Sequence, residues 1–293
     1  MRKPPLPLRN TIDLTHICET DPCDRTYALG SYWPNSRMSF ESRLVKCFKA
    51  CSPVVDHEPH ISSLCRFYAK MVLEKIGSER FDWVARVLGS KEREAEPSRP
   101  QSMLVDMICA SMGARNASDV FFKSETRPPM RSVGRLAGPE ALKARVQYVA
   151  QDLFIRPGKI EGSVLLIDDI GNTGASTRVY GWGLKQLGAS RVCAVNLAMT
   201  RFGGGKDGRG MLLLDTSGLG EFPSLMPAWI DEAAILHQRQ DCESLAKAVS
   251  CEPRFVAERA AAPCAVCAAE QGPQRRWWQA LFQGKGKARK GEG

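Results

Sequence analysis

The chain of 293 residues is 43% hydrophobic and 25% charged, which is close to the globular average, so a buried core is expected. No run of about 18 apolar residues occurs, and the pattern therefore excludes a membrane-spanning helix. The formal net charge of +9 suits an anionic ligand, either a phosphorylated metabolite or a nucleic acid.

The cysteines and the first residues favour a cytoplasmic protein. Eleven cysteines are an odd number and are scattered along the chain, so a complete disulfide framework is not expected and a reducing compartment fits better. The opening residues, MRKPPLPLRN, lack the apolar core of a secretory signal.

The first half of the chain predicts a loosely ordered, proline-rich lead-in over 1–24, followed by helices and short strands. In chain order we expect a helix over 39–49, a helix over 61–76, a strand over 81–88, a helix over 103–112 that Gly113 ends, and a short strand over 120–122. A charge-rich loop, GSKEREAEPSRP, separates the first strand from the helix that follows it.

The second half alternates strands and helices. After a basic, proline-punctuated loop over 126–138, we expect a helix over 141–153, a strand over 164–167, a helix over 173–187 that Gly188 ends, and strands over 192–199 and 211–214. This alternation predicts an α/β fold with a parallel twisted sheet of about five strands and flanking helices. Ligands of such sheets bind at the carboxyl ends of the strands.

One stretch, VLLIDDIGNTGAST over 164–177, carries the strongest functional signal. Its apolar run is typical of a parallel strand that is covered on both faces, and it ends in Asp168 and Asp169. The simplest interpretation is a core strand with solvated aspartates that cap the next turn. A P-loop ATPase is excluded because Gly158-Lys159 and Gly205-Lys206 lack the remaining residues of that motif. A phosphoacceptor receiver domain, with Asp215 on a later strand, is a further alternative.

The stretch can also form one anion-binding site. The backbone N–H groups over 172–177 would open a helix, whose N-terminus favours an anion. Gly174 and Ala175 allow a close approach of the backbone, and three side chains add hydroxyl donors: Thr173, Ser176 and Thr177. Two carboxylates would repel a phosphate unless a sugar diol lies between them. A ligand with a diol and a phosphate is a 5-phosphoribosyl group.

These residues resemble the 5-phosphoribosyl 1-diphosphate (PRPP) signature of type I phosphoribosyltransferases. The flanking segments resemble the ComF-like, competence-associated branch: YALGSYWP with Lys46 and Lys49, FDWVARVL, TRPPMRSVGRLAGPEALKARVQYVAQDLF and LKQLGASRVCAVNLAMTR. Asn172 replaces the first of two threonines that the family often has, and asparagine can still donate. The resemblance covers about residues 25–214 and implies the type I phosphoribosyltransferase fold with a small hood or lid.

The resemblance implies a domain over 25–232, after the lead-in over 1–24 and before a mostly irregular basic tail over 233–293. It implies transfer of a phosphoribosyl group from PRPP to a nitrogenous base in nucleotide metabolism, with Asp168, Asp169 and Arg131 as catalytic residues. Ser90 and Lys91 would bind diphosphate, and Arg127 and Arg135 would join Arg131 in a lid that excludes water. Mg²⁺ would be held mainly by PRPP and water, not permanently by the protein.

The alternative is a non-catalytic PRPP-binding accessory or regulatory protein. Its basic tail, with Arg275, Arg276, Trp277 and Trp278, could contact nucleic acid or a DNA-handling protein. Whether the protein forms a homodimer stays an open question at this point. Four thiolates could bind zinc if the termini meet, namely Cys18, Cys23, Cys264 and Cys267, although ordinary reduced thiols are the simpler interpretation.

Overall fold

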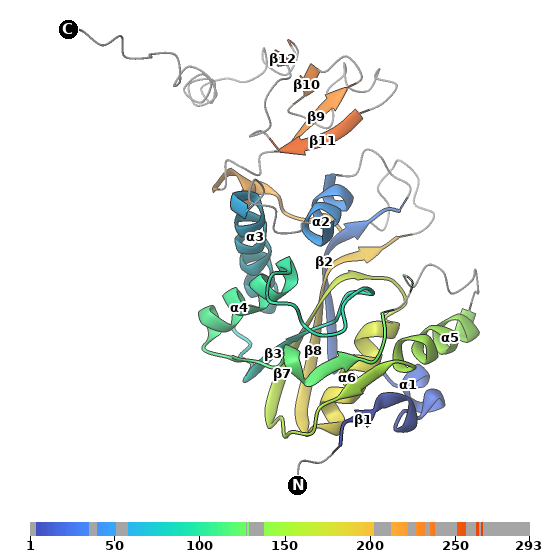
Figure 1. Ribbon diagram of the computed structural model, residues 1–293. Helices are drawn as coiled ribbons and strands as arrows, with labels where there is room; N and C mark the ends of the chain where they lie inside the picture. Colours follow the sequence, from blue (N-terminus) through green and yellow to red (C-terminus); the bar gives the residue numbers. More distant parts are fainter. Residues whose placement is uncertain are drawn as a thin grey trace, which may run out of the picture. The chain divides into compact units, whose positions relative to one another are not determined.

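A five-stranded parallel sheet lies at the centre of the first part of the chain (Figure 1). Its strands, in spatial order, are β2 (Arg25–Tyr32), β8 (Ala189–Thr200), β7 (Gly162–Gly171), β3 (Trp83–Arg86) and β4 (Arg115–Asn116). Every neighbouring pair in this sheet is parallel. The predicted α/β architecture is therefore confirmed.

This computed structural model describes residues 4–34, 40–50, 58–126, 128, 138–201, 212–221, 227–231, 235–237, 251–255, 262–263 and 265. The chain divides into two units, Met1–Phe222 and Pro223–Gly293. The first unit contains the parallel sheet, its helices and a second, smaller sheet. Three short 3-10 helices are described there: η1 (Leu8–Asn10), η3 (Ser118–Val120) and η5 (Ser217–Glu221).

Helices cover both faces of the parallel sheet (Figure 1). One group consists of α2 (Phe40–Ala50), α3 (Glu58–Ile76) and α4 (Pro100–Met112); the other consists of α6 (Ala175–Gln186), α5 (Gly138–Ala150) and α1 (Leu14–Glu19). The predicted helices over 39–49, 61–76 and 173–187 lie within two or three residues of α2, α3 and α6. The helix predicted from residue 103 starts earlier, because Pro100 opens α4 at a position where its missing N–H is not needed.

The apolar run of β7 is buried on both faces. Val164 and Leu166 belong to the core that includes Val179 and Leu184 of α6. Because side chains alternate along a strand, Leu165 points to the opposite face, and it is fully buried as well. Burial on both faces is what the continuous apolar run predicts for a central parallel strand.

The N-terminal residues are folded, and the prediction of a loosely ordered lead-in is wrong for residues 4–24. Leu8 and Ile17 are completely buried in the α6 side of the core. The Asp13 carboxylate caps α1 by accepting hydrogen bonds from the backbone N–H groups of Thr15 and His16, at 3.0 Å each. The many prolines suggested a loosely ordered segment, so the sequence alone did not indicate that these few residues anchor it in the core.

A small antiparallel sheet joins this N-terminal segment to the middle of the chain. Its strands are β1 (Leu6–Pro7), β6 (Leu153–Ile155) and β5 (Phe121–Lys123), in that order. The helix predicted over 141–153 ends at Ala150, so its last predicted residue, Leu153, instead begins β6. Leu153 is apolar and buried in either element, which is why periodicity could not separate the two.

The strand predicted over 211–214 is wrong for the described residues 212–214. These residues form no ladder with the sheet. Side chains hold them instead: the Leu212 N–H donates to the Ser31 hydroxyl at 2.8 Å, and the Leu214 N–H donates to the Glu41 carboxylate. The short apolar run fits the pattern of a strand, but its backbone N–H groups donate to side-chain oxygens and not to a neighbouring strand.

The second unit contains a four-stranded sheet in the order β11-β9-β10-β12. The strands are β9 (Pro227–Asp231), β10 (Ile235–His237), β11 (Cys251–Phe255) and β12 (Ala262–Pro263). Only β10 and β12 pair in parallel, and the other pairs are antiparallel. Arg275, Arg276, Trp277 and Trp278 lie outside the described residues.

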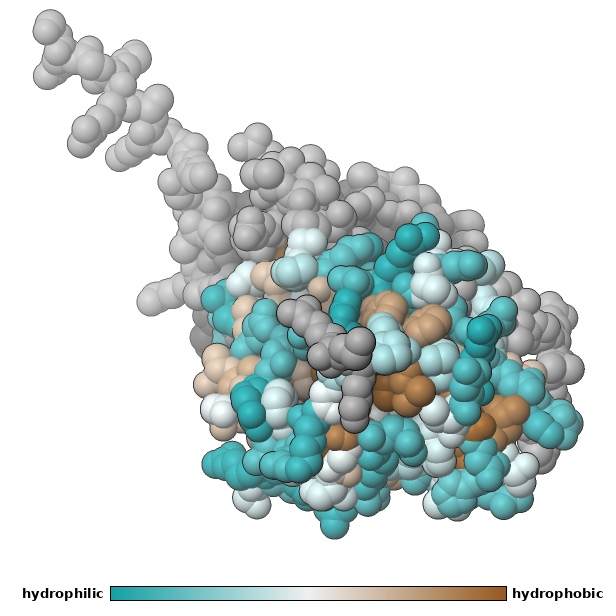
Figure 2. Space-filling model, turned by 60° about the horizontal axis from the view of Figure 1, so that its bottom comes forward, coloured by the Kyte–Doolittle hydropathy of each residue, from teal (hydrophilic) through white to brown (hydrophobic). Residues whose placement is uncertain are grey.

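The surface of the described residues is largely polar. On the face turned forward in Figure 2, hydrophobic residues form small groups among hydrophilic ones. The large hydrophobic side chains that are clearly exposed are Leu6, Leu212 and Leu213. None of the described helices has both the length and the apolar character needed to cross a lipid bilayer.

Candidate functional site

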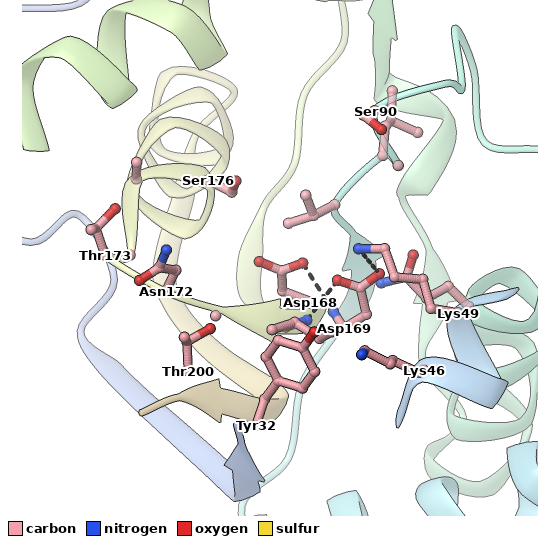
Figure 3. A pocket seen from close by; sticks show the side chains of 18 residues that line it. Tyr32, Lys46, Lys49, Ser90, Asp168, Asp169, Asn172, Thr173, Ser176 and Thr200 are labelled. Atoms are coloured by element: carbon pink, nitrogen blue, oxygen red, sulfur yellow. Dashed lines mark hydrogen bonds and ion pairs between the residues drawn. The ribbon is translucent and has the colours of Figure 1, made fainter. Parts of the chain in front are cut away.

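A cavity of about 450 Å³ lies at the carboxyl ends of four parallel strands (Figure 3). Tyr32 ends β2, Thr200 ends β8, and the residues from Val87 to Ser90 follow β3. The residues from Asp168 to Ser176 contribute the end of β7 and the start of α6. Lys46 and Lys49 of α2 and Gln101 of α4 complete the lining. This is the position at which parallel α/β sheets bind ligands.

The two acids of the motif border this cavity from the tip of β7. Alternation along the strand turns Asp168 toward the α6 side and Asp169 toward α2 (Figure 3). Each residue is only 7% exposed. The backbone N–H of Asp169 donates to Asp168 Oδ1 at 2.9 Å, and the N–H of Ile170 donates to Asp169 Oδ1 at 2.6 Å.

Lys49 provides a positive charge that partly balances the two acids. Its Nζ lies 2.7 Å from Asp169 Oδ2, and about half of its side chain is exposed. Burial alone would lower the pKa of Lys49, but the neighbouring Asp169 carboxylate outweighs it and raises that pKa. Lys49 therefore stays protonated at the wall of the cavity, where it can pair with Asp169 or with an anionic ligand.

Asp168 carries a much higher pKa than an ordinary aspartate. Burial, followed by the negative charge of Asp169, raises its pKa from 3.8 to about 7, and Lys49 only partly opposes this shift. The two carboxylates share one neighbouring cation, Lys49, so ionising both of them is costly. A ligand that offers hydroxyl donors or positive charge would favour the doubly ionised pair.

We expect Asp168→Asn to stabilise the protein more at pH 8 than at pH 5. The folded-state pKa of Asp168 lies above its unfolded value, so its contribution to stability is lost as the pH rises toward 7 and changes little above that. Asparagine does not ionise, so the advantage of the variant should grow by about 2 kcal/mol between the two pH values. Urea unfolding at both pH values measures it, and an equal advantage at each would contradict the raised pKa.

The first turn of α6 lies opposite α2 across the acids. Gly174 ends the preceding loop with φ 77°, a left-handed conformation that glycine adopts without strain. No side chain caps the helix, and its first turn contains no acidic residue. The leading N–H groups of a helix have no acceptor within the helix, so this turn can bind an anion. Ser176 belongs to this turn, and Asn172 and Thr173 precede it in the loop (Figure 3).

The loop that follows β3 is held rigidly by side chains. The Leu88 N–H donates to the Tyr180 hydroxyl at 3.1 Å, the Gly89 N–H donates to Glu92 Oε2 at 2.6 Å, and the Gly89 carbonyl accepts from Lys123 Nζ at 2.5 Å. A side chain at Gly89 would meet the Glu92 carboxylate, because an added Cβ would lie 2.9 Å from Oε2. Ser90 is therefore presented to the cavity from a fixed backbone.

A buried ion pair supports this loop from behind. Arg86, completely buried, donates to both oxygens of Glu92 at 2.8 and 2.6 Å, and its Nε donates to the Ser102 hydroxyl at 3.0 Å. Burial would raise the pKa of Glu92, but the hydrogen bonds and charge of Arg86 lower it below its usual value. Glu92 is thus ionised while it orients Gly89.

The structure brings most of the predicted site residues together. Asp168, Asp169 and the residues from Asn172 to Ser176 line one cavity with Ser90. Thr177 does not line it, because its side chain is buried and its hydroxyl donates to the Gly174 carbonyl at 2.9 Å. Lys91 lines an adjoining smaller cavity. The predicted lid residues Arg127, Arg131 and Arg135 lie outside the described residues.

The predicted zinc site gains no support from the described cysteines. The Cys23 thiol is buried and donates to the Thr177 carbonyl at 3.5 Å, and burial raises its pKa strongly. Burial also raises the pKa of Cys18. Cys264 and Cys267 are not described, and elsewhere in the described chain no group of three or more metal-ligating side chains occurs.

Among the lining residues that were not predicted, those with polar side chains are Tyr32, Lys46, Lys49, Gln101 and Thr200. Lys46 and Lys49 are three residues apart and so share a helix face, a spacing that could have marked them. Lys46 Nζ lies 5.5 Å from the centre of the Tyr32 ring, and both border the cavity. Thr200 directly follows a predicted strand, where the strand-end rule would place it at the site.

Comparisons with known proteins give structural neighbours only. No family model and no curated protein matches the chain. An adenine phosphoribosyltransferase structure matches with 16% identity over 50% of this chain and 74% of its own, at a TM-score of 0.30. The Saccharomyces cerevisiae enzyme, solved with a dideoxy-imino-altritol bisphosphate and adenine, gives 16% identity, coverages of 51% and 73%, and a TM-score of 0.32. The Thermoanaerobacter pseudethanolicus adenine phosphoribosyltransferase matches with 13% identity over 48% of this chain and 82% of its own, at a TM-score of 0.31.

Proposed function

We propose that the cavity binds PRPP and that the protein transfers its 5-phosphoribosyl group to a nitrogenous base. The observation that carries this proposal is that the acid pair, Asp168 and Asp169, and the first turn of α6 border the same cavity. A ligand that fits both must combine hydroxyl groups with a phosphate at a short distance. A phosphorylated pentose has this combination, in agreement with the resemblance of the motif to type I phosphoribosyltransferases of the ComF-like branch.

Three parts of the cavity would hold three parts of PRPP. The ribose hydroxyls would donate to the Asp168 and Asp169 carboxylates, and the 5-phosphate would accept from the N–H groups that open α6. The diphosphate would lie near Ser90, on the loop that Glu92 and Lys123 hold in place. Lys49, between the acids and this loop, could pair with the diphosphate.

In the reaction, the bond from the anomeric carbon to diphosphate breaks and a bond to a nitrogen of the base forms, while the base loses a proton. Positive charge develops on the sugar, where the carboxylates would stabilise it. Ionisation of Asp168 is thus most favoured when that charge appears. The lid arginines predicted over 127–135 would shield this step from water.

Mg²⁺ fits this donor set as a ligand-bound ion. The cavity offers carboxylate and hydroxyl oxygens, which hard cations prefer, but among the described side chains no cluster of three acidic or other metal-ligating groups forms a cage. Asp168 and Asp169 would contact it, directly or through water, while PRPP supplies most of its ligands. Its chemistry would be to offset the negative charge on the departing diphosphate.

The test is PRPP-dependent release of diphosphate. Protein, PRPP and Mg²⁺ are incubated with a panel of purine and pyrimidine bases, and we expect release with at least one base and none when Mg²⁺ is chelated. Titration calorimetry measures PRPP binding separately. Binding without turnover by any base would favour the alternative, a non-catalytic PRPP-binding protein. Absence of PRPP binding would overturn the proposal.

A further inference from the structure

The strands β2 and β8 end on a side of the cavity to which the proposed contacts with PRPP assign nothing. In the spatial order of the sheet, β7 with its two acids lies between β8 and β3. The loop after β3 presents Ser90, whereas β2 and β8 end in Tyr32 and Thr200, which are paired in the strand register. Figure 3 accordingly shows Tyr32 and Thr200 on one side of the acids and Ser90 on the other.

This arrangement indicates where an acceptor would enter. The argument rests on the proposed function, in which the diphosphate lies near Ser90. In a direct displacement, the attacking nitrogen approaches the anomeric carbon from the face opposite to the departing group. The acceptor would therefore lie over the ends of β2 and β8, where Tyr32 and Thr200 border the cavity. Helix α2 adds Lys46 to the same wall (Figure 3).

Tyr32 gives this wall an aromatic ring on a well-held backbone. Its carbonyl accepts a hydrogen bond from the Arg201 N–H at 2.9 Å, and the N–H of the next residue, Trp33, donates to the Ser42 hydroxyl of α2 at 2.7 Å. The strand end is thus tied both to the end of β8 and to α2. A flat aromatic ring suits a planar heterocycle, which can stack on it.

Lys46 brings a positive charge that no nearby carboxylate balances. Its Nζ lies 5.5 Å from the centre of the Tyr32 ring, within the range of a cation–π interaction. Lys49, on the same face of α2, is paired with Asp169 at 2.7 Å, but within the described parts of the chain no carboxylate forms an ion pair with Lys46. A cation of this kind at the wall of a cavity favours a ligand with a negative group.

The acids of the cavity leave room for such a group. Among the described residues that line the cavity, the carboxylates are those of Asp168 and Asp169. Alternation along β7 turns Asp168 toward α6, and Asp169 is paired with Lys49. A negative group beside Lys46 would therefore face a carboxylate that already has a cation, and the attraction to Lys46 would outweigh the repulsion.

We infer that Tyr32, Lys46 and Thr200 form the acceptor subsite and that it selects a planar nitrogen heterocycle that carries a carboxylate. The ring would stack on Tyr32, the carboxylate would pair with Lys46, and the Thr200 hydroxyl would hydrogen-bond to a polar edge of the ring. This deepens the proposed function by naming the class of acceptor. The ring nitrogen bonds to the anomeric carbon and loses its proton to water as diphosphate departs, so the carboxylate serves recognition alone.

The experiment is a calorimetric titration of orotate and of uracil into the full chain in the presence of saturating ribose 5-phosphate. Ribose 5-phosphate has no leaving group, so binding is measured without turnover. The two pyrimidines differ by the carboxylate of orotate, and we expect orotate to bind about tenfold more tightly, as one charge-assisted contact provides. With PRPP and Mg²⁺, the same preference should appear in kcat/KM for release of diphosphate.

Variants of the wall separate charge from stacking. Lys46→Met should remove most of the preference for orotate, and Lys46→Arg, which keeps the charge, should retain most of it. Tyr32→Leu should weaken the binding of both pyrimidines about tenfold and leave their ratio unchanged, because stacking does not depend on the carboxylate.

Lys75→Met is the matched control. Lys75 lies over the ring of Tyr27, another tyrosine of β2, with 6.0 Å between Nζ and the ring centre, and it lines neither cavity. This variant should leave both affinities unchanged.

The outcomes distinguish this inference from the proposed function. Equal affinities for orotate and uracil, absence of orotate binding, or a preference that Lys46→Met leaves intact would overturn the inference. So would a loss of ribose 5-phosphate affinity in Lys46→Met with an unchanged preference, because Lys46 would then contact the phosphate. Failure of ribose 5-phosphate to bind to the wild-type protein would instead count against the proposed function.

Discussion

Replacing Asp168 and Asp169 together with asparagine is expected to lower the affinity for PRPP about a hundredfold while the protein stays folded. Each carboxylate would accept hydrogen bonds from ribose hydroxyls, and hydrogen bonds to charged groups contribute about 1.5–3 kcal/mol each. Losing part of both contributions corresponds to about two orders of magnitude in the dissociation constant. Titration calorimetry with PRPP and Mg²⁺ measures the change.

The matched control for this variant is Asp215→Asn. Asp215 accepts a hydrogen bond from the Ser217 N–H at 2.9 Å and does not line either cavity, so its replacement should leave PRPP affinity unchanged. The circular dichroism spectrum of the double variant should match the wild type, because asparagine keeps the shape of both side chains. Unchanged PRPP affinity in the double variant would refute the role of the acids in binding ribose.

The second large effect concerns stability, not binding. Arg86→Met should lower the free energy of unfolding by about 3–5 kcal/mol, because it leaves the Glu92 carboxylate buried without its cation. It also removes the donor to Ser102. Urea unfolding followed by fluorescence measures the loss.

A double variant separates the charge from the packing. Arg86→Met with Glu92→Gln removes the stranded charge and should recover part of the lost stability. Lys159→Met is the control, because the Lys159–Glu161 pair is exposed on both sides and such pairs contribute little. An Arg86→Met variant as stable as the wild type would show that the buried pair is dispensable for folding.

Much of the fold follows from periodicity in the sequence. The run over 164–167 could be interpreted as a central parallel strand because no polar residue interrupts it, and the structure buries it on both faces. The predictions of secondary structure were wrong in two segments whose structure depends on only a few residues. Leu8 and Ile17 anchor an N-terminal segment whose prolines suggested disorder, and residues 212–214 resemble a strand but pair with side chains.

The candidate site was predictable to the extent that one segment carries it. Asp168, Asp169 and the start of α6 are contiguous in sequence, so their spacing alone indicated an acid pair beside an anion site. Lys49 and Gln101 come from helices far away in the chain, and only the fold brings them to the cavity. Gln101 was hidden further because the charge-rich segment before it suggested a loop that continued through Pro100.

The contact between Lys123 and Gly89 links two parts of the protein that the chain keeps 34 positions apart. Lys123 belongs to β5 of the small antiparallel sheet, and its ammonium group reaches the loop beside the cavity. In a screen for inactive variants, substitutions in that outlying sheet should therefore emerge alongside those in the pocket. Lys123 could then be mistaken for a residue that contacts the ligand, although its contact is with the Gly89 carbonyl. Measuring the mobility of the loop after β3 in a Lys123 variant would separate the two roles.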